Sequence, residues 1–135
     1  MAARFLLDTN ICIYIQRQRP AEVFARFRKM QPGDAAISVV TWGELCYGAA
    51  KSRQRERAQQ LLDEFITLVP VLPMPVDTAQ AYGTIRALLE SKGTPIGNND
   101  LWIAAHAKAA GMTVVTNNEK EFRRVPGLKV QNWVA

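Results

Sequence analysis

Metal-binding and disulfide-forming side chains are scarce in this sequence. It contains two cysteines, Cys12 and Cys46, and one histidine, His106. Both cysteines lie in apolar stretches with no metal-binding spacing between them, so we expect reduced thiols in a cytoplasmic protein. This scarcity argues against a disulfide framework and against a zinc site built from Cys and His ligands.

Long hydrophobic runs and a positively charged leader pattern are also missing. No apolar stretch approaches the roughly 18 residues that a membrane-spanning helix needs, and the start of the chain lacks the pattern of a secretion signal. We therefore expect no membrane partner and no export. Internal repeats, low-complexity tracts and linkers are absent from the sequence, and 135 residues with 48% hydrophobic side chains predict a single domain over residues 1–135.

Basic side chains outnumber acidic ones, 17 to 12, which gives a formal net charge of +5 and a pI near 9.6. An excess of this size favours a polyanionic partner, although many basic proteins bind no nucleic acid. The basic residues gather in segments 17–29, 51–57 and 120–124. Each segment offers contacts to an RNA backbone, and each also suits an ordinary solvated helix face.

Apolar strand patterns alternate with amphipathic helix patterns along nearly the whole chain. We expect strands at 5–7, 35–39, 68–74, 113–116 and 129–133, and helices at 11–18, 20–30, 41–50, 58–66, 77–92 and 99–110, with a short helix or turn at 117–124. Asp77, followed three residues later by Gln80, predicts a helix cap. The alternation predicts an α/β domain of three layers, with a mainly parallel sheet between helices.

Most acidic residues have an adequate structural explanation in a turn, a helix start or a polar helix face, namely Glu22, Asp34, Glu56, Asp63, Glu64, Asp77 and Glu90. Asp8, Glu44 and Asp100 fit less easily. Asp8 ends a buried strand, where α/β folds bind ligands, and it equally suits a helix cap. Glu44 lies in a largely apolar helical stretch, where an unpaired carboxylate is costly to bury. Asp100 opens an apolar helix, where an acid also stabilises the helix dipole.

These three acids predict a hard divalent cation. Carboxylates that lie close together raise one another's pKa, and a bound cation relieves the repulsion. Because Cys and His ligands are missing, Mg²⁺ or Mn²⁺ is favoured over zinc. A carboxylate-bound cation beside a basic surface suits phosphodiester hydrolysis, since the cation polarises the phosphate and activates water.

Four segments in this order resemble one known family. They are Leu6-Leu7-Asp8-Thr9-Asn10, then Ser38 with Thr41-x-x-Glu44-Leu45 and Gly48, then Pro95-Ile96-Gly97-x-x-Asp100-x-x-Ile103-Ala104, and finally Val114-Val115-Thr116-Asn117-Asn118 with Phe122. In them the chain resembles the VapC-like PIN-domain ribonucleases, the toxins of bacterial type II toxin–antitoxin systems. The resemblance implies a Rossmann-like PIN fold with a five-stranded sheet, and cleavage of RNA as an endonuclease that depends on Mg²⁺ or, in its place, Mn²⁺.

The family pattern also implies roles for individual residues. On it, Asp8, Glu44 and Asp100 are the catalytic acids, and Asp8 and Asp100 ligate the metal. Thr9 and Asn10 would position Asp8 and the attacking water.

One position departs from the pattern. Many PIN domains carry an aspartate shortly after the last core strand, and this chain has Asn118 there, followed by Glu119 and Glu121. Asn118 or Glu121 would fill this fourth position, or the two glutamates form a solvated face. The departure leaves open whether one or two metals bind.

The resemblance further implies partners. The substrate would be a structured RNA, commonly tRNA in its anticodon region, with initiator tRNA favoured. A cognate antitoxin would wrap the toxin and insert a basic side chain into the acidic pocket. The complex would dimerise through the toxin and bind its operator DNA through the antitoxin.

Two other functions compete with the nuclease. One is a catalytically weak PIN scaffold that binds RNA or a partner, for which Asn118 is the only support. The other is an α/β phosphatase or phosphotransferase that uses Asp8 as its nucleophile. Haloacid-dehalogenase-like enzymes of that kind need a second aspartate two residues further on, where this chain has Asn10.

Overall fold

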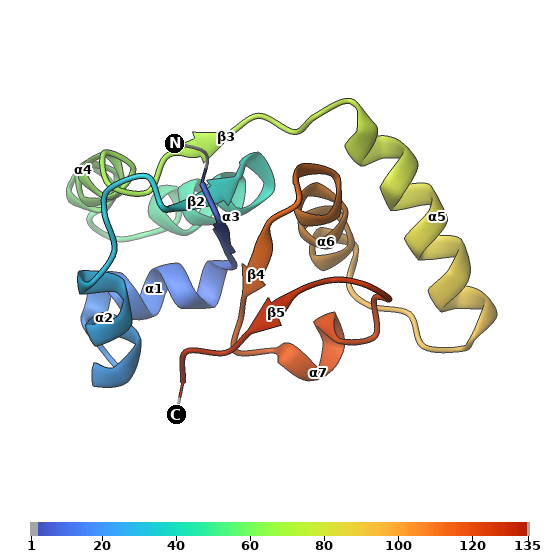
Figure 1. Ribbon diagram of the computed structural model, residues 1–135. Coiled ribbons are helices and arrows are strands. Elements are labelled where there is room, and N and C mark those ends of the chain that lie inside the picture. Colours follow the sequence, from blue (N-terminus) through green and yellow to red (C-terminus); the bar gives the residue numbers. More distant parts are fainter. Residues whose placement is uncertain (1–2, 135) are drawn as a thin grey trace.

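A five-stranded parallel sheet forms the middle layer of the protein (Figure 1). The computed structural model describes residues 3–134. The strands are β1 (Phe5–Leu7), β2 (Ala35–Ser38), β3 (Val71–Leu72), β4 (Thr113–Val115) and β5 (Val130–Gln131). The helices are α1 (Thr9–Arg17), α2 (Ala21–Arg28), α3 (Val39–Ala50), α4 (Arg55–Phe65), α5 (Asp77–Ser91), α6 (Asn98–Ala110) and α7 (Glu119–Phe122).

The strand order, β3-β2-β1-β4-β5, places β1 in the centre of the sheet. Every neighbouring pair is parallel, and Leu7 of β1 pairs with Val115 of β4. The chain builds one half outward from β1 to β3 and then returns to lay β4 on the other side of β1. The strand order therefore reverses between β1 and β4, which is where open α/β sheets bind ligands beyond the carboxyl ends of their strands.

Side chains that alternate along β1 feed two separate cores. Leu6 packs among residues of α5, α6 and α7, whereas Leu7 packs among residues of α1, α2, α3 and α4, and both leucines are fully buried. This alternation follows from the two-residue period of a strand. The two sets of helices lie on opposite sides of the sheet (Figure 1), so the predicted three-layer α/β arrangement is confirmed.

Several boundaries differ from the sequence expectations. The strand expected at 68–74 keeps only Val71–Leu72, because Pro70 and Pro73 flank it and donate no ladder hydrogen bonds. The strand expected at 35–39 stops one residue early, because Ser38 caps α3 by accepting a hydrogen bond from the Val40 N–H. The last strand is likewise reduced to two residues.

The capping role predicted for Asp77 is wrong. Asp77 is the first residue of α5, and the cap position is Val76, without a side-chain cap. A helical turn already exists there, since the Pro75 carbonyl accepts from the Thr78 N–H and the Val76 carbonyl accepts from the Ala79 N–H. Across residues 3–134, no helix is both long and apolar enough to cross a membrane.

Candidate functional site

Asp8 ends β1 and caps α1 at the same time. Its Oδ1 accepts a hydrogen bond from the Ile11 N–H at 3.0 Å, and its Oδ2 accepts one from the Thr116 hydroxyl at 2.5 Å. The carboxyl is 6% exposed. Burial, opposed by these hydrogen bonds, raises the pKa of Asp8 above its ordinary value, and the nearby Glu44 charge adds to the increase. The helix-cap explanation is therefore correct, and it leaves Asp8 facing other carboxylates.

Thr116 is the site residue that the sequence reasoning missed as a support for Asp8. It follows β4, the strand beside β1, and is fully buried. Its hydroxyl donates to Asp8 and accepts from the Asn118 N–H at 2.8 Å. One threonine thus links the first acidic position to the loop that carries the fourth. The position of Thr116 directly after β4 was the feature of the sequence that could have indicated this role.

Glu44 reaches the same site from α3. It is half-buried, and its Oε1 accepts a hydrogen bond from the Thr9 hydroxyl at 2.7 Å. Thr9 therefore orients Glu44, whereas the side chain of Asp8 is held by Thr116 and by the Ile11 N–H. Asn10 has an exposed side chain and contributes a backbone hydrogen bond to Asp8.

Asp100 lies in the first turn of α6 and is half-buried. Its pKa is raised from 3.8 to about 6, first by burial and then by the negative charges of Glu121, Asp8 and Glu44 in that order. The part of this increase that does not come from burial reflects mainly the negative charges of the neighbouring acids. The structure thus brings the three predicted acids together and adds Glu121 to them.

Glu121 and Asn118 both lie at the fourth position but do different things. Glu121 Oε1 accepts a hydrogen bond from the Gly97 N–H at 2.8 Å, and its Oε2 accepts one from the Asn118 side-chain amide. Asn118 thus holds Glu121, and Glu121 brings the negative charge. Glu119 turns away from the site, since it forms an ion pair with Arg123 at 3.0 Å that lowers the pKa of Glu119.

The site acids lack basic partners within the described chain. The ion pairs among residues 3–134 join Arg4 to Asp34, Arg86 to Glu90 and Arg123 to Glu119, and none involves the site. Carboxylate oxygens without a compensating cation are the donors that hard divalent ions prefer.

Gly97 leaves room beside these carboxylates. A Cβ at this position would lie 3.8 Å from both Asp100 Oδ2 and Glu121 Oε1. Over residues 3–134, no three Asp, Glu, His or Cys side chains are already gathered closely enough to ligate one ion. The donors fit a divalent cation in kind and charge.

Some side chains of the predicted basic segments already contact other parts of the protein, and others are exposed. Arg26 donates to Gln131 and stacks over Trp133, and Arg124 donates to the Pro95 carbonyl. The segment 51–57, at the turn from α3 into α4, has exposed basic side chains. A groove of about 410 Å³ between α1, α3 and α4 begins at Thr9 and Glu44 and ends near this turn.

Known proteins are similar to this chain in sequence and in fold. Residues 5–128 match the PIN domain family model. A tRNA(fMet)-specific endonuclease VapC of Shigella flexneri is 44% identical over 130 residues, 96% of this chain and 98% of its own. A Ribonuclease VapC2 of Haemophilus influenzae is 40% identical over 131 residues, 97% of this chain and 98% of its own.

Solved structures agree. DNA-bound VapBC from Salmonella typhimurium matches with a TM-score of 0.90 at 41% identity, covering 97% of this chain and 98% of that one. VapBC2 from Rickettsia felis, bound to a promoter DNA fragment, matches with a TM-score of 0.88 at 40% identity, covering 96% and 98%.

The chain therefore belongs to the PIN-domain family and, within it, to the VapC ribonucleases of toxin–antitoxin systems. The family and the PIN fold expected from the four sequence segments are confirmed. PIN nucleases in general depend on a divalent metal, in keeping with the donor chemistry of this site.

Proposed function

We propose that this VapC-family ribonuclease cuts a structured RNA, with tRNA the favoured class and initiator tRNA the favoured member, and that it thereby inhibits translation and growth. The observation that carries the proposal is the group of acids at the strand-order reversal, where Asp100 has a pKa of about 6 and no basic side chain of residues 3–134 pairs with it. Similar proteins named tRNA(fMet)-specific endonucleases support the choice of RNA.

Asp8 and Asp100 would hold Mg²⁺, with Mn²⁺ able to substitute, and the ion would supply phosphate polarisation and an activated water. Thr116 fixes the Asp8 carboxylate through a short hydrogen bond. Glu44 keeps one oxygen on Thr9, so its other oxygen is free to orient or deprotonate a water. Glu121 adds the charge that Asn118 lacks, and we assign it the fourth acidic position.

The described surfaces also suggest how partners would bind. The exposed basic turn 51–57 offers contacts to the RNA backbone. An antitoxin would place a basic side chain among the acids. It would also place apolar side chains in the groove between α1, α3 and α4. The similar VapBC complexes bound to DNA support an antitoxin that carries the protein to operator DNA. We further propose a homodimer acting in the cytoplasm.

The two competing functions, a binding scaffold and a phosphatase or phosphotransferase, have less support than the nuclease. The binding-scaffold function depended on Asn118, and Glu121 supplies a negative charge beside it. The phosphatase function needs a second aspartate two residues after Asp8, and this chain has Asn10 there.

The test is a digest of total bacterial tRNA by protein freed of any co-purified partner, with Mg²⁺, with Mn²⁺ and with excess EDTA. Asp8→Asn keeps the shape of the side chain and removes the charge, so we expect discrete fragments from the wild type and none from this variant. Asp63→Asn, on the exposed face of α4, is the matched control and should cut normally. Cleavage that survives both EDTA and Asp8→Asn would refute the site.

A further inference from the structure

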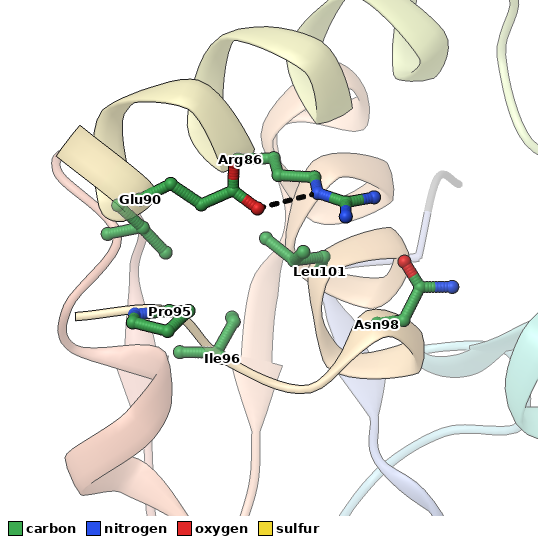
Figure 2. A pocket seen from close by; sticks show the side chains of 7 residues that line it. Arg86, Glu90, Pro95, Ile96, Asn98 and Leu101 are labelled. Atoms are coloured by element: carbon green, nitrogen blue, oxygen red, sulfur yellow. Dashed lines mark hydrogen bonds and ion pairs between the residues drawn. The ribbon is translucent and has the colours of Figure 1, made fainter. Parts of the chain in front are cut away.

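A second pocket lies between α5 and the start of α6 (Figure 2). Its volume is about 210 Å³, below the roughly 300–1,000 Å³ of pockets for drug-sized ligands. Apolar side chains and polar groups line it together, namely Arg86, Glu90, Pro95, Ile96, Asn98 and Leu101. This combination suits a small planar group with polar edges.

The polar side of the pocket is held in place by a chain of hydrogen bonds. Arg86 Nε pairs with Glu90 Oε2 at 3.1 Å, and Arg86 Nη1 donates to the Tyr82 hydroxyl at 2.8 Å. That hydroxyl donates to Asn98 Oδ1 at 2.6 Å. The Tyr82 ring stacks on Trp102, with centroids 3.9 Å apart and planes 13° apart. The polar groups are therefore ordered before any ligand arrives.

Groups on this rim still have unused hydrogen-bonding capacity. Within residues 3–134, Arg86 Nη2, Asn98 Nδ2 and Glu90 Oε1 make no protein hydrogen bond. Two donors and one acceptor thus stand at the edge of an apolar floor. A nucleobase presents the complementary surface, since it has an apolar face and an edge of donors and acceptors.

The pocket and the acids share one wall. Ile96 lines the pocket, and the next residue, Gly97, donates its N–H to Glu121 among the acids. Asn98 lies two residues before Asp100 in the first turn of α6. A phosphate at Asp100 would therefore lie at the same end of α6 as this pocket.

We propose that this pocket binds one unpaired nucleobase of the RNA substrate, next to the phosphate that is cut. The proposal rests on the ribonuclease function proposed above and adds a site that reads the sequence beside the cut. Sequence-specific RNA recognition typically targets unpaired bases that a protein can splay out. Arg86 and Asn98 recognise the base edge, while Tyr82 is a positioning residue that holds both.

The test combines protein variants with base deletions in the substrate. The substrate is a synthetic RNA hairpin spanning the cut that the tRNA digest reveals, together with versions that lack one base at each position flanking the cut. We measure kcat/KM for the wild type, Arg86→Ala and Asn98→Ala. Lys92→Ala removes an exposed positive charge at the end of the same helix that does not line the pocket, and is the matched control.

At one flanking position, we expect base deletion to lower the wild-type kcat/KM by about tenfold. Arg86→Ala and Asn98→Ala should each lower it roughly three- to tenfold on the intact hairpin, the size expected for a lost hydrogen bond, and have little further effect once that base is gone. Any loss from Lys92→Ala should be the same factor on both RNAs. This dependence on one base is what a purely structural or phosphate-binding role would not produce.

The proposal would be overturned if each protein variant lowered kcat/KM by the same factor on every RNA, whichever base is deleted. The hydrogen-bond chain would then only position α6 or bind phosphate. Cleavage by both variants equal to the wild type would overturn it too. Urea unfolding of each variant identifies misfolding, and Tyr82→Phe gives a milder variant that keeps the stacked ring. A wild type that cuts no RNA would refute the proposed function, whereas a cutting wild type with independent losses would refute this pocket alone.

Discussion

Replacing Asp100 by asparagine should abolish cleavage and yet stabilise the fold when no divalent metal is present. The pKa of Asp100 is raised from 3.8 to about 6, so the folded state disfavours the charged carboxyl that the unfolded chain tolerates. The difference is roughly 160-fold in proton affinity, or about 3 kcal/mol at most. The neutral amide of the variant would resemble the protonated carboxyl and avoid this penalty.

Two effects reduce that figure. Asp100 is only half-buried, so solvent and salt screen part of the repulsion. The charge also stabilises the first turn of α6, an effect of about 0.3–1 kcal/mol that the variant loses. We therefore expect Asp100→Asn to raise the free energy of unfolding by about 1 kcal/mol at pH 7 in EDTA.

The pH dependence fixes the sign of the effect. The folded pKa is raised, so the wild type carries its full penalty above pH 6, where the carboxyl is ionised in both states, and loses the penalty as pH falls towards 3.8. The advantage of the variant should shrink across this window. Mg²⁺ should reverse the order, because an ion that binds only the folded wild type at about 100 times its dissociation constant adds about 2.7 kcal/mol.

The assay is urea unfolding of the wild type and Asp100→Asn between pH 7 and pH 4.5, with EDTA and with Mg²⁺. Asp63→Asn, an exposed acid on α4, controls for net charge and should change the free energy of unfolding by less than about 0.5 kcal/mol. A variant that is less stable than the wild type in EDTA at pH 7 would refute the electrostatic reasoning.

Further predictions concern the supports of the acids. Thr116→Val keeps the shape but removes the hydrogen-bond partner of Asp8 Oδ2 and of the Asn118 N–H, so urea unfolding should show a loss of about 1–3 kcal/mol, together with slower cleavage. Gly97→Ala places a methyl beside Asp100 at a backbone φ of −57° that any residue adopts. Cleavage should fall at least tenfold with unchanged unfolding, and undiminished cleavage would contradict a bound ion there. The Mg²⁺ concentration for half-maximal cleavage should rise as pH falls below about 6, because protons compete for Asp100; a flat profile would contradict this.

The sequence predicted the acids better than their supports. Asp8, Glu44 and Asp100 each interrupt an apolar pattern, so each can be noticed within a few residues of chain. Thr116 interrupts nothing, and its partner Asp8 lies 108 positions away. Such a contact exists only once β4 is laid beside β1, which no local pattern specifies.

The same distinction holds for the fold. The alternation of strands and helices correctly predicted a parallel three-layer domain, because burial on both faces of a sheet imposes it. Strand ends depended on single residues, such as Ser38, whose side chain starts α3 within the expected strand. The nucleobase pocket combines α5 with the start of α6, and its residues have no distinctive spacing in the sequence.

The central claim, that these acids form a metal-dependent RNA-cutting site, is tested most directly by a Mg²⁺ titration of tRNA cleavage at pH 7 with the wild type and Asp100→Asn side by side. We predict a saturable rise in wild-type cleavage that EDTA abolishes, and no cleavage by the folded variant at any Mg²⁺ concentration. Equal cleavage by both proteins, or wild-type cleavage indifferent to Mg²⁺ and EDTA, would contradict it.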